Sequence, residues 1–360
     1  MANENLANAK KAKNDEFYTQ YIDIEKEVSA YLEYDPDVFK NKIILLPCDD
    51  PEWSNFTKYF AQNFERFGLK KLISTSYASA SKLYDTNYQP TLFEINNPKY
   101  DEFKTIKNGK IFTLDHDTTH DGRIDINDLE WHYLEGDGDF RSDEIKKLRD
   151  EADIIITNPP FSQFRIFLAW IIASSKRFLI IGNINAITYK EVFPLIKDNK
   201  VWLGPSITSG DREFEVPKDV VDMTKFTGKI RDGRYYQRVV GVRWFTNIDH
   251  GRRHQPISLM SEKDVIKYST KKPFDRYDNY DAIEVPYVKL IPNDFDGVMG
   301  VPISFLDKYS PEQFEILGSD YEVKDGKLPQ LVNSSWQGKL DRGYITGRRA
   351  YSRILIKHKR

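Results

Sequence analysis

Residues 153–161 read DIIITNPPF, and this stretch decides the fold class. Its first part, Asp153–Thr157, is short, β-branched and nearly all apolar, which is typical of a buried strand in a parallel sheet. The chain alternates such runs with amphipathic segments of helical spacing, which predicts a doubly wound α/β domain. The other strand-like runs are Lys42–Leu46, Lys70–Thr75 and Arg177–Gly182, and the helical segments are 54–68 (SNFTKYFAQNFERFG) and 164–172 (FRIFLAWII).

The first helical segment has residues at both ends that are typical of helix termini. Ser54 can cap the start of a helix through its hydroxyl, and Gly68 can end it in a left-handed conformation. Between them, aromatic residues recur on one face at the spacing of a helix. We therefore predict a helix that packs this aromatic face against the sheet.

The chain changes character in its second half. Arg238–Phe245 (RVVGVRWF) predicts one strand, and the turn-rich stretch before it favours hairpins at the far edge of the sheet. From about His250 onward Pro, Gly, Asp and Tyr are frequent, and the strand-like runs are short, as in Tyr287–Ile291 and Arg353–Lys357. We therefore expect a larger domain over residues 1–247 and a smaller, irregular region over residues 248–360.

Composition limits the classes of protein that are possible. Among 360 residues, 40% are hydrophobic and 14% aromatic, which excludes a globally disordered chain. No apolar run has the length of a membrane span, and the first residues lack the apolar stretch of a signal peptide, so we expect a cytoplasmic protein. Cys48 is the only cysteine, which excludes a disulfide framework and a cysteine-built zinc site.

The charge is divided unevenly along the chain. Residues 1–160 carry 20 Lys and Arg against 31 Asp and Glu, whereas residues 161–360 carry 33 against 24. The last 22 residues hold eight basic side chains and one acidic one, Asp341. This asymmetry indicates that the second half contacts a polyanion, with an unevenly charged solvated surface as the alternative.

The tetrapeptide Asn158-Pro159-Pro160-Phe161 carries the chemistry. It follows a predicted parallel strand, and open α/β sheets bind their ligands at the carboxyl ends of such strands. The Asn158 side-chain oxygen and the Pro159 carbonyl can each accept one N–H bond from an exocyclic amino group, which aims its nitrogen lone pair at an electrophile. The prolines stiffen the loop, and Phe161 offers a face on which a flipped base can stack. The alternative is a proline-rich turn with no chemical role.

The tetrapeptide resembles the catalytic motif of adenine-N6 DNA methyltransferases that use S-adenosylmethionine. Further segments, in the same order along nearly the whole chain, are similar to the EcoRI-type adenine methyltransferase family. The resemblance implies a Rossmann-like methyltransferase sheet, a cofactor-binding catalytic domain over 1–247, and a target-recognition region over 248–360. The segments are 15–20 (DEFYTQ), 47–51 (PCDDP), 136–142 (GDGDFRS), 179–183 (LIIGN), 243–247 (RWFTN) and 299–302 (MGVP).

The same resemblance assigns residues to S-adenosylmethionine. It implies that Asp139 accepts a hydrogen bond from the cofactor's adenine amino group and that Phe140 stacks on its ring. The chain departs from the wider class because residues 48–56 (CDDPEWSNF) lack the usual glycine-rich turn. The remaining cofactor residues implied are Phe17, Tyr18, Thr19, Pro47, Cys48 and Asp49, with Tyr77 a weaker candidate at the end of the second strand.

A run of aspartates from Asp117 to Asp128 resembles a calcium-binding loop. It ends in Asp where such loops carry a bidentate Glu, and the residues before it read as a strand. We therefore expect a polar turn here and no metal site.

The resemblance implies that the chain methylates adenine in double-stranded DNA after flipping the base. It also implies a monomer without a stable protein partner, in a system that can include a cognate restriction endonuclease. We expect DNA contacts from Arg252 and Arg253, or from Arg348 and Arg349, and the sequence does not separate base from phosphate roles. Two alternatives stay open: an enzyme that methylates RNA or a protein amide through the same tetrapeptide, and a catalytically silent DNA-binding relative.

Overall fold

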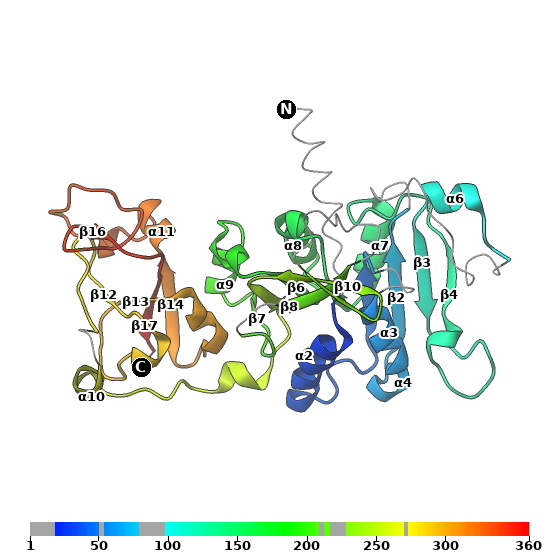
Figure 1. The fold of residues 1–360 in the computed structure, drawn as a ribbon, viewed down its shortest axis with the longest axis horizontal. Coiled ribbons are helices and arrows are strands. Elements are labelled where there is room, and N and C mark those ends of the chain that lie inside the picture. Colours follow the sequence, from blue (N-terminus) through cyan, green and yellow to red (C-terminus); the bar gives the residue numbers. More distant parts are fainter. Residues whose placement is uncertain are drawn as a thin grey trace, which may run out of the picture. The chain divides into compact units, whose positions relative to one another are not determined.

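The computed structural model describes residues 19–49, 54–78, 98–208, 212–216, 228–269 and 273–359. The chain divides into two compact units (Figure 1). Unit 1 comprises Met1–Tyr189 and Gly204–Ile248, and unit 2 comprises Lys190–Leu203 and Asp249–Arg360. The division after Ile248 lies one residue from the boundary expected from sequence, and unit 2 also takes in Lys190–Leu203.

Seven strands of unit 1 form one mixed sheet in the order β4-β3-β2-β1-β5-β6-β11. The four central strands, β2, β1, β5 and β6, are parallel, whereas β3, β4 and β11 run antiparallel to their neighbours. Leu45 of β1 lies opposite Ile73 of β2 on one side and Ile155 of β5 on the other. The strands are β1 (Ile43–Pro47), β2 (Lys71–Ser76), β3 (Lys110–Leu114), β4 (Glu130–Tyr133), β5 (Ile154–Thr157), β6 (Arg177–Asn183) and β11 (Val242–Thr246).

Helices cover both faces of this sheet, which confirms the doubly wound α/β prediction (Figure 1). Ile44 and Leu46 of β1 belong to a core shared with three helices that precede β2. On the other face, the Phe164 ring lies 4.9 Å from the Phe245 ring of β11. The helices against the first face are α2 (Tyr21–Tyr34), α3 (Asn55–Gln62) and α4 (Phe64–Phe67). In chain order, α6 (Glu102–Lys107) precedes β3, α7 (Asp143–Glu151) lies between β4 and β5, and α8 (Phe164–Ile172) follows β5.

The predicted helix over 54–68 forms with the predicted ends. The Ser54 hydroxyl accepts a hydrogen bond from the Phe56 N–H at 3.1 Å, and Gly68 ends the segment with φ 61°. The helix is interrupted at Asn63, which separates α3 from α4. The aromatic face is buried as expected.

Arg238–Phe245 forms two strands, so the prediction of one strand is wrong. Gly241, with φ 73°, turns the chain after Val239, and β11 then begins at Val242. The left-handed backbone at Gly241 cannot continue a strand, which explains the break. The residues before the turn belong to a separate antiparallel sheet of β8 (Arg212–Val216), β10 (Arg234–Val239) and β9 (Lys229–Arg231), in that order.

Unit 2 has a four-stranded sheet in the order β12-β13-β17-β14 and a short hairpin of β15 and β16. The strand predicted at 353–357 is confirmed as β17, one residue later. The strand predicted at Tyr287–Ile291 is wrong: Val288–Leu290 form a single 3₁₀ turn, η7, between two prolines that cannot donate to a strand ladder. The strands are β7 (Trp202–Leu203), β12 (Ile283–Glu284), β13 (Met299–Val301), β14 (Phe314–Ser319), β15 (Tyr344–Ile345), β16 (Arg348–Arg349) and β17 (Ile354–His358). The helices are α9 (Phe193–Lys197), α10 (Glu262–Tyr268) and α11 (Asp320–Lys324), with 3₁₀ turns η6 (Gly251–His254), η8 (Ile303–Lys308) and η9 (Pro329–Leu331).

None of the helices that the structure describes is long and apolar enough to cross a membrane. Within the same residues, no group of three or more His, Cys, Asp or Glu side chains is placed to hold a metal ion. In the loop between β3 and β4, Asp128 accepts hydrogen bonds from the N–H groups of Thr118, Thr119 and Asp125, each at 2.9 Å. These contacts hold the loop in a polar turn.

Candidate active site

The carboxyl ends of β1, β2 and β5 bring the predicted site residues to one edge of the unit 1 sheet. These strands are parallel neighbours, so their last residues lie at the same edge. Cys48 and Asp49 follow β1, Tyr77 follows β2, and Asn158 follows β5. Residues up to 110 positions apart in sequence therefore meet where this class of sheet binds its ligands.

The motif at 158–161 forms a stiff link between β5 and α8. Asn158 is half-buried and Pro159 is buried. The Pro160 carbonyl accepts the Gln163 N–H at 2.9 Å, which closes a 3₁₀ turn, η3 (Phe161–Gln163), directly before α8. Phe161 packs against the core cluster on one side while remaining partly exposed. The ring therefore has support behind it and an accessible part in front.

Gly182 of β6 fixes where α8 begins. A Cβ atom added at Gly182 would lie 2.4 Å from the Phe164 ring. Only glycine lets this ring rest directly on the strand, and Phe164 is the first residue of α8. The helix after the motif is thereby held against the sheet.

A buried cluster of hydroxyls surrounds Asp49, and the sequence analysis did not identify it. The Asp49 carboxylate accepts hydrogen bonds from Ser54 Oγ at 2.8 Å and Thr157 Oγ1 at 2.5 Å. Thr157 Oγ1 also lies 2.6 Å from the Pro47 carbonyl, and Ser74 Oγ bonds to the Asp49 carbonyl. This cluster joins the end of β1 to the residue immediately before Asn158. One feature of the sequence could have indicated this cluster: polar residues end the otherwise apolar runs of β2 and β5.

Tyr77 links Cys48 to Asp139 and Phe140. Burial raises the pKa of the Tyr77 hydroxyl well above 10, and its hydrogen bond with Cys48 and the charge of Asp139 act in the same direction. A backbone hydrogen bond from Phe140 has the opposite, smaller effect. The weakest of the sequence candidates therefore lies in the middle of the candidate cofactor residues.

The loop over 136–140 packs closely on the end of β2. Gly138 has φ +85°, and a Cβ atom there would lie 2.4 Å from the Ser76 carbonyl oxygen, so only glycine fits. The Ala78 N–H donates to the Asp137 carbonyl at 2.9 Å. These contacts hold the following residue, Asp139, beside Tyr77.

Asp139 forms an ion pair with Arg141. Arg141 lies in the segment 136–142, but the sequence did not predict a role for it. Arg141 Nε and Nη2 donate to the two carboxylate oxygens at 2.9 and 2.5 Å. Partial burial raises the pKa of the Asp139 carboxyl, but the hydrogen bonds and charge of Arg141 outweigh it, so the pKa is lowered overall. Asp139 is therefore ionised near neutral pH and can accept a hydrogen bond from an amine.

Phe140 lies in the core, which differs from the stacking role implied by resemblance. Its side chain is 0% exposed, with ring centroids 5.0 Å from Phe167 and 5.7 Å from Trp170. Both neighbours belong to α8, so this ring anchors the loop to the helix after the motif. No ring face of Phe140 is open to a purine in this structure.

The remaining predicted cofactor residues are placed less completely. Phe17 and Tyr18 lie outside the described residues. Thr19 is buried, its carbonyl accepts the Asn55 side-chain amide at 2.8 Å, and its hydroxyl oxygen has no hydrogen-bond partner among the described residues. Cys48 has φ 70°, a left-handed conformation that is rare for residues other than glycine.

The four predicted DNA-contacting arginines all lie in unit 2, in two different settings. The guanidinium of Arg253 is 3.7 Å from the centroid of the Trp202 ring and bonds to Asp249 and Asn199, and the residue is only 9% exposed. Its contacts hold Lys190–Leu203 against η6. Arg252 is half-buried, whereas Arg348 and Arg349 of β16 are exposed. Arg349 also pairs with Asp341 at 2.7 Å.

Comparison with known proteins agrees with this geometry. The chain is 39% identical to the Type II methyltransferase M.EcoRI of Escherichia coli over 361 residues, which is 99% of this chain and 97% of that one. It is 33% identical to the Type II methyltransferase M.MpnI of Mycoplasma pneumoniae, covering 98% and 97%. No solved structure gives a significant match. The family model described as adenine-specific methyltransferase EcoRI matches residues 5–359, and the chain therefore belongs to the EcoRI family of adenine-specific methyltransferases.

Proposed function

We propose that this chain transfers the methyl group of S-adenosylmethionine to the N6 amino group of adenine in double-stranded DNA, after flipping the base out of the helix. The observation that carries the proposal is the position of Asn158-Pro159-Pro160-Phe161. This motif lies at the same sheet edge as Cys48, Tyr77 and Asp139, in a chain of the adenine-specific family.

The residues at this edge fit S-adenosylmethionine. Asp139 is ionised and partly exposed, and the buried Thr19 hydroxyl oxygen has no hydrogen-bond partner among the described residues. We assign Thr19, Cys48, Tyr77 and Asp139 to hold the cofactor, and keep Phe17 and Tyr18 as candidates from sequence. When bound, the cofactor supplies an electrophilic methyl group on a sulfonium centre. Pro47 and Asp49 are assigned a supporting role and not a direct contact with the cofactor. The Asp49 carboxylate already accepts hydrogen bonds from Ser54 and Thr157, and the Pro47 carbonyl bonds to Thr157.

The motif residues act on the target amine. The Asn158 side-chain oxygen and the Pro159 carbonyl accept the two N–H bonds of the adenine amino group, which turns the nitrogen lone pair towards the methyl group. The prolines and the η3 turn hold both acceptors in place before the substrate arrives. Phe161 stacks on the flipped base with its accessible part. A sulfonium methyl is a good electrophile, so no metal ion or strong general base takes part.

DNA contact is assigned to unit 2. Arg348 and Arg349 are exposed and Arg252 is half-buried, so these three remain candidates. Arg253 is buried, and its guanidinium contacts Trp202, Asp249 and Asn199. We propose a monomeric, cytoplasmic enzyme that acts at a specific site. The relatives are named Type II methyltransferases, which supports a role within a restriction-modification system. A cognate restriction endonuclease would then share the recognised site without binding this chain.

Incubation with tritiated S-adenosylmethionine tests the proposal. DNA from a host without adenine methylation, total RNA and a protein extract are offered in parallel, with Asn158→Ala as the inactive control. We expect label in DNA alone, recovered as N6-methyladenine after digestion to nucleosides. Label confined to RNA or protein would replace the proposal with one of those activities. Cofactor binding without transfer to any of the three would identify a silent relative.

A further inference from the structure

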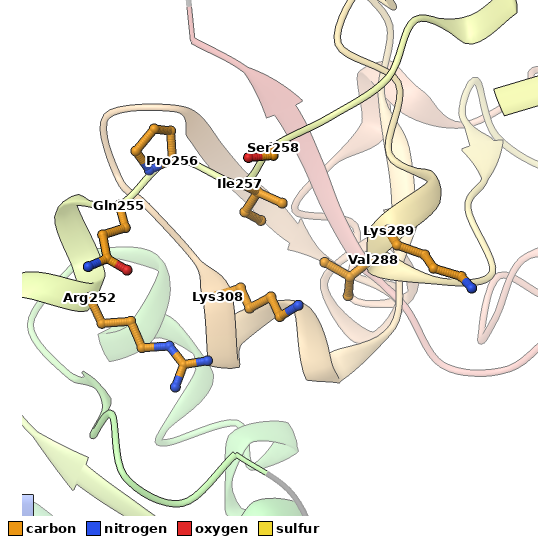
Figure 2. Close-up of a pocket in the computed structure, with 8 residues that line it drawn as sticks. All are labelled: Arg252, Gln255, Pro256, Ile257, Ser258, Val288, Lys289 and Lys308. Atoms are coloured by element: carbon orange, nitrogen blue, oxygen red, sulfur yellow. The ribbon is translucent and has the colours of Figure 1, made fainter. Parts of the chain in front are cut away.

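A basic pocket in unit 2 has no role in the chemistry described above. It has a volume of about 360 Å³, and its walls come from three separate segments: η6 with the residues after it, η7, and η8 (Figure 2). These segments are up to 56 positions apart in sequence, from Arg252 to Lys308. The fold therefore builds the pocket from distant parts of the chain.

The charge of the pocket is of one sign. Arg252, Lys289 and Lys308 line it, and no Asp or Glu is among the described residues that do so. Gln255 and Ser258 add hydrogen-bond donors to the lining of the pocket. Like charges gathered in a concave surface repel one another and concentrate the positive potential, so the pocket favours an anion.

The arrangement of the cations distinguishes between kinds of anion. In Figure 2, Arg252, Lys308 and Lys289 follow one another along one side of the pocket, opposite Pro256 and Ser258. The Lys289 side chain extends away from the other two. A site for a single free phosphate would direct its donors at one point, whereas a row of cations matches the row of phosphates along a nucleic-acid strand. The half-buried Ile257 and Val288 supply apolar surface for the sugars between the phosphates.

We propose that this pocket binds consecutive backbone phosphates of one strand of the substrate DNA, with Arg252, Lys308 and Lys289 each contacting a phosphate. The inference rests on the proposed function, since it takes duplex DNA as the substrate. Contacts of this kind position the duplex and carry no sequence information. Arg252 is therefore assigned to the backbone and not to a base.

The test is the salt dependence of DNA binding. Fluorescence anisotropy of a labelled duplex of random sequence is measured over a range of NaCl concentrations for Arg252→Gln, Lys289→Gln, Lys308→Gln and the triple variant. The controls are Lys263→Gln and Lys324→Gln, which remove exposed lysines from α10 and α11 of the same unit. Thermal melting followed by circular dichroism establishes that each variant is folded.

We expect each single variant to reduce the slope of log K against log salt by about 0.9, and the triple variant by about three times as much. Affinity should fall by the same factor for every duplex sequence, and the two controls should leave the slope unchanged. An unchanged slope in the triple variant, or an equal reduction in the controls, would overturn the proposal.

A second measurement separates a DNA strand from a free anion. Saturable binding of inorganic phosphate to the wild-type protein without DNA, abolished by any one of the three substitutions, would indicate a small-anion site and overturn the assignment. The tritium-transfer experiment reports separately on the proposed function. A changed slope with no label in DNA would retain the pocket and reject the methyltransferase activity.

Discussion

The hydroxyl of Thr157 offers the most direct test of how the proposed catalytic motif, Asn158–Phe161, is held. It lies 2.5 Å from the Asp49 carboxylate and 2.6 Å from the Pro47 carbonyl, in the residue that precedes Asn158. Thr157→Val keeps the shape of the side chain and replaces the hydroxyl with a methyl group. Asp49 is only 6% exposed, so water cannot readily replace the lost donor.

The expected loss of stability follows from two opposing contributions. A hydrogen bond to a charged group stabilises a protein by about 1.5–3 kcal/mol, whereas burial of the added methyl group returns about 0.8 kcal/mol. The free energy of unfolding, measured in urea, should therefore fall by roughly 1–2 kcal/mol. The denaturant slope should stay constant, because the surface exposed on unfolding is unchanged.

The effect on catalysis distinguishes positioning from stability. A small displacement of Asn158 moves both acceptors away from the target amine, so we expect kcat to fall by about 10-fold to 100-fold. The control is Thr246→Val at the opposite edge of the same sheet, which removes a buried hydroxyl that donates to the Phe178 carbonyl at 2.6 Å and accepts the Ile248 N–H at 2.9 Å. Thr246→Val should lose at least as much stability, with kcat per folded molecule retained. Equal kcat in the two variants would refute the reasoning.

Three other predictions concern separate parts of the chain. Asn158→Ala should lower kcat by about 10²–10³-fold with cofactor affinity retained, whereas Asp139→Ala should weaken cofactor binding measured by calorimetry; the reverse pattern would exchange the two roles. Gly138→Ala should destabilise the protein and weaken cofactor binding, because its Cβ would lie 2.4 Å from a carbonyl oxygen, whereas Gly122→Ala, with the same φ of +85° and nothing within 4 Å, should cost only about 1 kcal/mol. The two carboxylates beside His254 raise its pKa above 6.5, so their stabilisation is complete below that pH and is lost as pH rises through the folded value. The free energy of unfolding of wild type relative to that of His254→Gln should decrease from pH 6 to pH 8. A difference that does not depend on pH would show that the carboxylates beside His254 do not stabilise the protein.

Local patterns predicted the elements that position the site. Short β-branched runs gave the central parallel strands, and helical spacing with Ser54 and Gly68 gave α3 and α4. The sequence placed Cys48, Tyr77 and Asn158 each after a predicted strand, and the common edge of the parallel strands brings them near one another. These inferences depend on neighbouring residues and on a general rule of α/β sheets, so a single sequence is sufficient for them.

Contacts between distant segments were beyond such patterns. Arg253 stands beside Arg252 in the sequence, but Trp202 and Asn199, about 50 positions earlier, take up its guanidinium. The resemblance assigns Phe140 to stack on the cofactor, yet α8 buries its ring. In both cases the residue type was compatible with a ligand or a core, and only the tertiary neighbours decide between them.

The turn after β1 has a left-handed residue, Cys48, but no glycine. Cys48 occupies the left-handed conformation, φ 70°, that a glycine-rich turn would provide, at a cost of about 1–2 kcal/mol for a residue with a side chain. A glycine there would remove this cost and also remove the thiol that bonds to Tyr77. The Tyr77 hydroxyl in turn accepts a backbone hydrogen bond from Phe140, and the charge of Asp139 acts on it, so the thiol connects the turn after β1 to the loop that carries Asp139. The left-handed residue after β1 therefore also supplies a side-chain contact to Tyr77, at the edge of the sheet where we propose that the cofactor binds.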